Sequence, residues 1–416
     1  MKGIIRLFTI LTSAILFFTV VISLSECGNK EKTLEPDKRG EAYANPATCV
    51  SCHKEVYSSY THTAHFHTST AVDGNKLQAE SIANDHTFIF SDSLKITIDK
   101  RKDGLYQTAY FKGNKIRSER FDIAFGANEK AQTYGYWKGN RLYELPLSYF
   151  KEINNWANSP GFPSNLVYYD RAIVSHCFEC HGSYLEKTFV QTGAMSVAEE
   201  YDKKSIIYGI DCQRCHGPAA EHVQYHLDNP TDKTAKYIKT YNALSRQLKV
   251  DMCAVCHGGN DLKTEKSTFK YKPGDNLASF YDPNFGASSN PDVHGNQAKL
   301  LEMSRCYLNS PKLTCTTCHN VHQQEKTDPA LLSQKCMDCH KEQTHNFCKM
   351  ASQIGSSITT KCIDCHMPTL PSNVISFKMS AKKETSQYLL HTHRIAIYPE
   401  QTSKILSLIK NAKYSN

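Results

Sequence analysis

Apolar and polar residues follow distinct patterns at the two ends of the chain. An apolar run from Leu7 to Leu24 is interrupted only by Thr and Ser, and it follows Lys2 and Arg6. This layout is typical of an export signal, although a run of this length also permits an uncleaved membrane anchor. In the tail, the apolar residues of Thr402–Lys413 recur at helical spacing, which predicts a short amphipathic helix that packs on the protein.

The segment 87–163 has a different period. Apolar and polar residues alternate in 94–99 and again in 121–125, as in strands with one buried face. Turn sequences lie between and after these runs, at Lys102–Gly104, Gly113–Asn114 and Lys138–Asn140. We therefore predict an antiparallel β insertion of four to six short strands. We interpret it as a scaffold, with a docking face or a lid as the alternative.

A Cys-x-x-Cys-His motif recurs along the remaining sequence. The segments between its copies are short, polar and compatible with helix. We number its seven copies in chain order: motif 1 is Cys49–His53, motif 2 Cys177–His181, motif 3 Cys212–His216, motif 4 Cys253–His257, motif 5 Cys315–His319, motif 6 Cys336–His340 and motif 7 Cys362–His366. Two thiols at this spacing can each bond one vinyl group of a single haem, and the next residue places an imidazole at the iron. The candidate thiols are Cys49, Cys52, Cys177, Cys180, Cys212, Cys215, Cys253, Cys256, Cys315, Cys318, Cys336, Cys339, Cys362 and Cys365, and the proximal imidazoles are His53, His181, His216, His257, His319, His340 and His366.

Zinc knuckles and redox dithiols also contain Cys-x-x-Cys. An odd number of knuckles, each followed directly by histidine, fits neither. Histidine is 19 of 416 residues, so chance would almost never supply seven such followers. We therefore predict seven covalently attached haem c groups, whose iron and rings form much of the interior.

These cofactors change the meaning of the formal charge. The chain carries +8, and removal of residues 1–26 takes away Lys2, Arg6 and Glu26, which leaves +7. Seven haems bring fourteen propionates, so the reduced protein would be near −7 and the ferric protein near zero. The basic sequence is thus no argument for nucleic-acid binding, and we expect none.

The stretch Leu24–Gly28 resembles a lipoprotein cleavage box, and a polar tether follows from Asn29 to Glu41. It predicts lipidation of Cys27, although Glu26 departs from the usual small residue before the cysteine. The alternative is an ordinary secretory signal. Either way, we expect the folded part to be periplasmic or membrane-tethered, on the oxidising side of a membrane.

Several stretches resemble the cytochrome c-554 family and its multihaem relatives. They are Thr63-Ala64-His65 after motif 1, Leu145-Pro146 with Ser159–Phe162, Gly209–His222 around motif 3, and Asp292–Asn296 ahead of motif 5. Motif 7 followed by Met367-Pro368 resembles the last motif of the pentahaem nitrite reductases and hydroxylamine oxidoreductases, a wider superfamily. The resemblance implies that His65, His222 and His294 are distal iron ligands. Because the chain lacks a complete Cys-x-x-Cys-Lys motif, a catalytic haem does not follow.

Other histidines are candidates by position. His322 lies three residues after His319 and cannot easily reach the opposite face of the same haem, so we expect it to bind the iron of a neighbouring one. His345, His393 and His86 are weaker candidates for further distal positions. The remaining histidines outside the motifs are His62, His67, His176, His226 and His391, of which His226 rivals His222 and His391 rivals His393.

Two cysteines are left outside the motifs and the N-terminal region. Cys306 and Cys348 are expected to form a disulfide or to stay as buried thiols, and the sequence does not decide between them. His345–Lys349 resembles a Cys-x-x-Cys-Lys motif without its first cysteine, and we do not expect it to hold an eighth haem.

We predict a mainly α multihaem cytochrome with a haem-packed core, short helices and one β insertion. Its predicted parts are a signal peptide (1–26), a polar tether (27–45), a first haem segment (46–86), the β insertion (87–163), a six-haem domain (164–378) and a C-terminal tail with a possible distal ligand (379–416).

The histidine inventory separates the possible functions. Twelve histidines lie outside the motifs, and seven of them would make every iron six-coordinate. This favours an electron carrier between redox proteins or a quinol-linked membrane complex. One five-coordinate iron would instead permit a reductase or oxidase of nitrite or hydroxylamine, with His86 and His393 as the least secure ligands. A haem-bearing subunit of a membrane redox complex is the third hypothesis.

Overall fold

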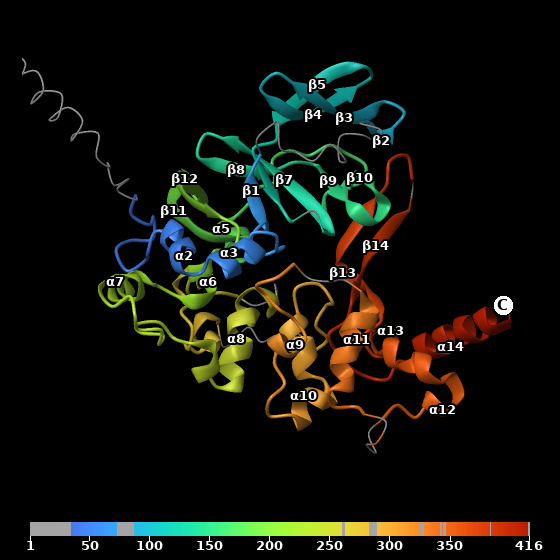
Figure 1. Ribbon diagram of the computed structural model, residues 1–416. Coiled ribbons are helices and arrows are strands. Elements are labelled where there is room, and N and C mark those ends of the chain that lie inside the picture. Colours follow the sequence, from blue (N-terminus) through green and yellow to red (C-terminus); the bar gives the residue numbers. More distant parts are fainter. Residues whose placement is uncertain are drawn as a thin grey trace, which may run out of the picture.

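The computed structural model describes residues 35–72, 87–127, 129–259, 263–282, 289–324, 328–341, 343, 347–382 and 384–414. Antiparallel sheets form the upper part of the molecule in Figure 1, and short helices form the lower part. In the described residues no helix is long and apolar enough to cross a membrane.

The upper part is built from two sheets. A four-stranded sheet runs in the order β2 (Thr87–Ser91), β3 (Leu94–Arg101), β4 (Gly104–Phe111) and β5 (Asn114–Arg120). A six-stranded sheet contains β1 (Ser69–Ala71), β6 (Ile123–Phe125), β7 (Ala131–Lys138), β8 (Arg141–Glu144), β9 (Leu147–Phe150) and β10 (Asn155–Asn158). The antiparallel pairing predicted for 87–163 is confirmed, but β2 to β10 supply more strands than expected.

Alternation of side chains explains why these strands form sheets with one covered face. Ile96 and Ile98 of β3 are buried, whereas their polar neighbours stay accessible. The two sheets are joined by Gln107, which is fully buried and whose side chain donates to the Leu147 carbonyl (2.8 Å) and accepts from the Leu147 amide (3.0 Å). An aromatic core around Phe121 and Trp156 fills the space between them.

The prediction of a mainly α fold is wrong, because helix and strand occur in nearly equal shares. Besides the two upper sheets, two long hairpins lie in segments where no strand was predicted. They are β11 (Gly182–Gly193) with β12 (Ser196–Tyr208), and β13 (Thr369–Lys378) with β14 (Thr385–His391). Most side chains of these hairpins are solvent-accessible, so their sequences lack the period of two that reveals a half-buried strand.

The helices are short. They are α2 (Pro46–Cys52), α3 (Lys54–Tyr60), α5 (Ser175–His181), α6 (Cys212–His216), α7 (Ala220–Asp228), α8 (Arg246–His257), α9 (Gln297–Glu302), α10 (Arg305–Asn309), α11 (Pro329–Met337), α12 (Ala351–Ile354), α13 (Cys362–His366) and α14 (Pro399–Tyr414). Single 3-10 turns are η1 (Lys151–Ile153), η2 (Tyr241–Ala243), η3 (Thr268–Lys270), η4 (Leu277–Phe280), η5 (Cys315–Thr317) and η6 (Ser356–Thr360). The helix predicted for 402–413 is confirmed as α14.

The first cysteine of each motif lies in a helical segment, and polar residues fix where several of these segments begin. The side chains of Asn45, Asp211, Ser245 and Asp328 accept hydrogen bonds from the first backbone amides of α2, α6, α8 and α11. In α6 and α13 the helix and the motif coincide. The predicted division into domains is not tested by this arrangement and stays a prediction.

Candidate functional site

Four histidine pairs are the main feature of the lower part. In each pair one ring belongs to a motif and the other comes from elsewhere in the chain. The ring centres are 6.4 Å apart for His53 and His222, 6.1 Å for His65 and His257, 5.9 Å for His216 and His322, and 6.1 Å for His319 and His393. The folded chain therefore brings together residues that are far apart in sequence.

This separation fits a metal held between two imidazoles. Metal–nitrogen bonds of about 2 Å on both sides place two ring centres about 6 Å apart. The eight rings also remain reachable, since each residue is half-buried or exposed. A planar group that carries its metal between the rings is thus compatible with the donor set.

Carbonyl oxygens of the backbone or of a side chain orient several histidine rings of the motifs and pairs. The Nδ1 atom of His222 lies 2.8 Å from the Lys236 carbonyl oxygen, and that of His366 lies 2.8 Å from the Ala396 carbonyl oxygen. The Nδ1 atom of His257 likewise lies 3.3 Å from the side-chain oxygen of Gln297. A hydrogen bond donated from Nδ1 fixes the ring and leaves Nε2 to bind a metal.

Electrostatics favour the neutral form that metal binding requires. Burial lowers the pKa of His216, and the neighbouring His322 and His53 lower it further. Burial is likewise the main cause that lowers the pKa of His181 and His294.

Cysteine side chains connect neighbouring motifs. Four thiol pairs lie within hydrogen-bonding range: Cys49 with Cys212, Cys180 with Cys256, Cys253 with Cys315, and Cys336 with Cys362. They join motif 1 to 3, 2 to 4, 4 to 5, and 6 to 7. Motifs 3 and 5 are joined by His322, which follows motif 5 in the chain and pairs with His216 of motif 3. Motifs 1 to 5 therefore form one connected set.

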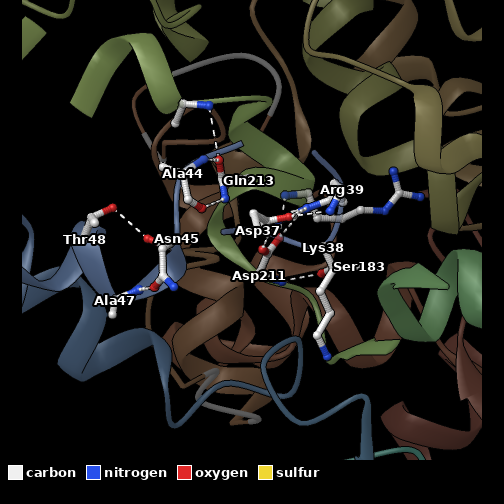
Figure 2. Close-up of polar contacts among 12 residues, drawn as sticks. Asp37, Lys38, Arg39, Ala44, Asn45, Ala47, Thr48, Ser183, Asp211 and Gln213 are labelled. Atoms are coloured by element: carbon white, nitrogen blue, oxygen red, sulfur yellow. Dashed lines mark hydrogen bonds and ion pairs between the residues drawn. The ribbon is translucent and has the colours of Figure 1, made fainter. Parts of the chain in front are cut away.

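An N-terminal strap of residues 35–45 is clamped onto motif 3 (Figure 2). The guanidinium of Arg39, with a side chain only 4% exposed, donates to both oxygens of Asp37 and both oxygens of Asp211. Asp211 in turn caps α6 through the Arg214 amide at 2.8 Å. The carboxylate of one residue thus holds both the strap and the start of the motif.

Gln213, an inner residue of motif 3, forms the second half of the clamp. Its side chain accepts from the Ala44 amide (2.9 Å), donates to the Ala44 carbonyl (2.8 Å) and also accepts from the Ala219 amide (3.1 Å). Sequence reasoning missed this role because the motif pattern leaves its two inner positions unspecified. A polar amide next to Arg214 was the only signal.

Other predicted site residues are placed less completely. His294 lies near His181 of motif 2 and His257 of motif 4, close enough for their charges to interact. Cys27, His86 and His345 lie outside the described residues. Cys306 and Cys348 are free thiols, so the disulfide alternative is not formed.

Comparisons with known proteins agree with a redox cytochrome. No family model matches the chain. The dissimilatory sulfite reductase MccA of Wolinella succinogenes is 22% identical over 87% of this chain, which spans 56% of the length of that relative. The crystal structure of the outer cell wall cytochrome OcwA matches with a TM-score of 0.50 and 15% identity, over 88% of this chain and 82% of the other.

These likenesses support a multihaem, cytochrome-like redox protein. At this identity the likeness to OcwA shows the fold alone. Neither match is to the cytochrome c-554 family, so that resemblance stays a prediction.

Proposed function

We propose that the chain is an exported heptahaem c-type cytochrome that transfers electrons between redox partners. The observation that carries this proposal is the set of four histidine pairs, each 5.9–6.4 Å across. Bound haem supplies one-electron exchange at its iron. The motif cysteines would anchor each group, and the paired imidazoles would hold its iron and exclude substrate.

The pairs support specific ligand assignments. His222 is the distal ligand for motif 1, His322 for motif 3, His65 for motif 4 and His393 for motif 5. His294 is the candidate for motif 2 on the basis of its position near His181. His86 and His345 remain candidates for the irons left over.

The predicted signal and tether support a location outside the cytoplasm, with attachment to a membrane through a lipid on Cys27 or through an N-terminal anchor. In that setting the partners are redox proteins or a quinol-linked membrane complex.

A reductase is the second candidate, and two observations favour it. One relative is named a dissimilatory sulfite reductase, although this chain spans only 56% of it. In addition, His181 of motif 2 makes a ring contact with Phe125, at 6.0 Å between centres. An open iron at motif 2 would take a small oxyanion such as nitrite or sulfite.

Haem content and spin state test both candidates on the purified full-length holoprotein. Mass spectrometry should show seven haem additions, and low-temperature electron paramagnetic resonance should show low-spin iron that nitrite and sulfite leave unchanged. A high-spin signal that shifts on addition of either anion would establish the reductase and displace the carrier. Fewer than seven additions would contradict the haem count.

The ligand assignments are tested by His222→Ala. We expect about one seventh of the iron to become high-spin, because the motif 1 iron loses one axial ligand. His67→Ala is the matched control, since the Nε2 of His67 already bonds the Thr61 carbonyl at 2.7 Å. An unchanged spectrum for His222→Ala would show that His222 is not a ligand.

A further inference from the structure

Three motifs meet at one backbone carbonyl, that of Glu179 inside motif 2. Arg214 of motif 3 donates to this oxygen from Nη2 at 2.9 Å, and the Cys256 thiol of motif 4 lies 3.6 Å from it. The thiols of Cys180 and Cys256 also interact at this place. Motifs 2, 3 and 4 therefore share a junction, which we call the Glu179 junction.

Two charged side chains are buried at this junction. Arg214 is 8% exposed, and its Nη1 and Nη2 donate to the carbonyl and hydroxyl oxygens of Thr268 at 2.7 and 3.1 Å. Its cationic group also lies 5.5 Å from the ring centre of Phe269. The Nε of Arg214 is buried and bonds to nothing in the described residues. Arg214 thus carries a full positive charge into the interior beside the motif cysteines.

The opposite charge is the side chain of Glu179, which is 4% exposed as a residue. Ser267 donates to one carboxylate oxygen at 2.7 Å, and Thr268 donates to the other at 3.2 Å. The Nδ1 of His176 also lies 3.5 Å from the Oε2 of Glu179. Hydrogen-bond donors therefore surround a carboxylate that lies on the other side of the Thr268 hydroxyl from Arg214, and such donors favour its charged form.

Packing alone does not account for two buried charges. A buried ion pair is often no more stabilising than apolar side chains of similar volume, because both charges lose their hydration. The two charges lie where three motifs converge, and burial reduces their screening by water, so their field acts on all three. A nearby positive charge favours the reduced state of an iron, and a negative charge favours the oxidised state.

We propose that the buried charges of Arg214 and Glu179 set the reduction potentials at motifs 2, 3 and 4. The two charges act in opposite directions. This inference rests on the proposed function, since it requires haem at these motifs. Arg214 holds the potentials high, and Glu179 holds them low. The junction would thereby distinguish these three sites from motifs 1, 5, 6 and 7.

Spectroscopic redox titration of the full-length holoprotein tests the proposal. In Arg214→Gln, the components that account for up to three of seven haems should shift to lower potential. In Glu179→Gln, the same components should shift to higher potential. Arg214→Lys keeps the charge and should leave the titration close to that of the natural protein. Arg117→Gln is the matched control, because it removes an arginine of β5 in the four-stranded sheet, outside the Glu179 junction, that pairs with Asp170 at 2.9 Å.

Haem content separates the failure of this inference from the failure of the proposed function. If the unsubstituted protein does not carry seven haems, the proposed function itself is contradicted. With seven haems present, unchanged potentials in both Arg214→Gln and Glu179→Gln overturn the role of the junction, and so do shifts in the same direction. If Arg214→Gln does not mature, an unshifted Glu179→Gln titration overturns the proposal by itself.

Discussion

Replacement of Arg39 by alanine should release the N-terminal strap from motif 3. In the clamp of Figure 2, the guanidinium of Arg39 pairs with the carboxylates of Asp37 and Asp211 at once. The Asp37 side chain is only 1% exposed and that of Asp211 is 13% exposed. Alanine would leave two carboxylates close together, poorly hydrated and without a counter-charge.

The expected loss follows from this burial. Removal of one partner from a buried ion pair costs about 3–5 kcal/mol, because the remaining charge has lost its water and has no compensation. The strap contacts the rest of the protein at an edge, so the loss should appear as local opening of residues 37–44. A change of 1.4 kcal/mol is a factor of ten, so the opening equilibrium should rise roughly 100- to 4,000-fold.

Hydrogen exchange of the backbone amides measures this opening. The reporters are the Gly40 amide, bonded to the Asp37 carbonyl at 3.1 Å, and the Ala44 amide, bonded to Gln213 at 2.9 Å. Amides of β3 and β4 are the internal control and should not change. Arg39→Lys should show an intermediate effect, because lysine keeps the charge but loses the two-pronged geometry. A change of less than tenfold at Gly40 and Ala44 in Arg39→Ala would refute the reasoning.

Two further predictions concern stability. Gly209→Ala should lower the free energy of unfolding by about 3–5 kcal/mol, because a Cβ there would lie 2.1 Å from the Phe66 carbonyl oxygen at a φ of +65°. The control is Gly139→Ala, which has a φ of +61° and no atom within 4 Å of the added Cβ, and it should cost only about 1–2 kcal/mol. Equal losses in thermal or chemical unfolding would show that the clash at Gly209 is relieved. Burial alone would raise the pKa of Asp99, but hydrogen bonds from two threonines and an arginine lower it overall, so its contribution to stability should be complete above about pH 4 and fall away as the pH drops through the lowered value. Asp99→Asn should remove that part of the acid dependence, and an unchanged pH profile would contradict the assignment.

Local chemistry made some features predictable. The seven motifs could be found because two thiols and an imidazole must lie at fixed spacing to hold one haem. The turns of 87–163 and the helix at the C-terminus were also predictable, since each depends on residues close in sequence. Gln107 and the two long hairpins were not, because their partners or their exposure depend on distant segments.

The sequence by itself determined the haem chemistry and the candidates for it, because the number and order of cysteines and histidines are covalent facts. Only the tertiary structure decided which histidine faces which motif, such as His393 from the tail against His319. It also decided that Gln213 and Arg214 are buried anchors where the motif pattern leaves these positions open. The physical reason is that a pair or a junction is set by packing between segments distant in the chain, which no local spacing specifies.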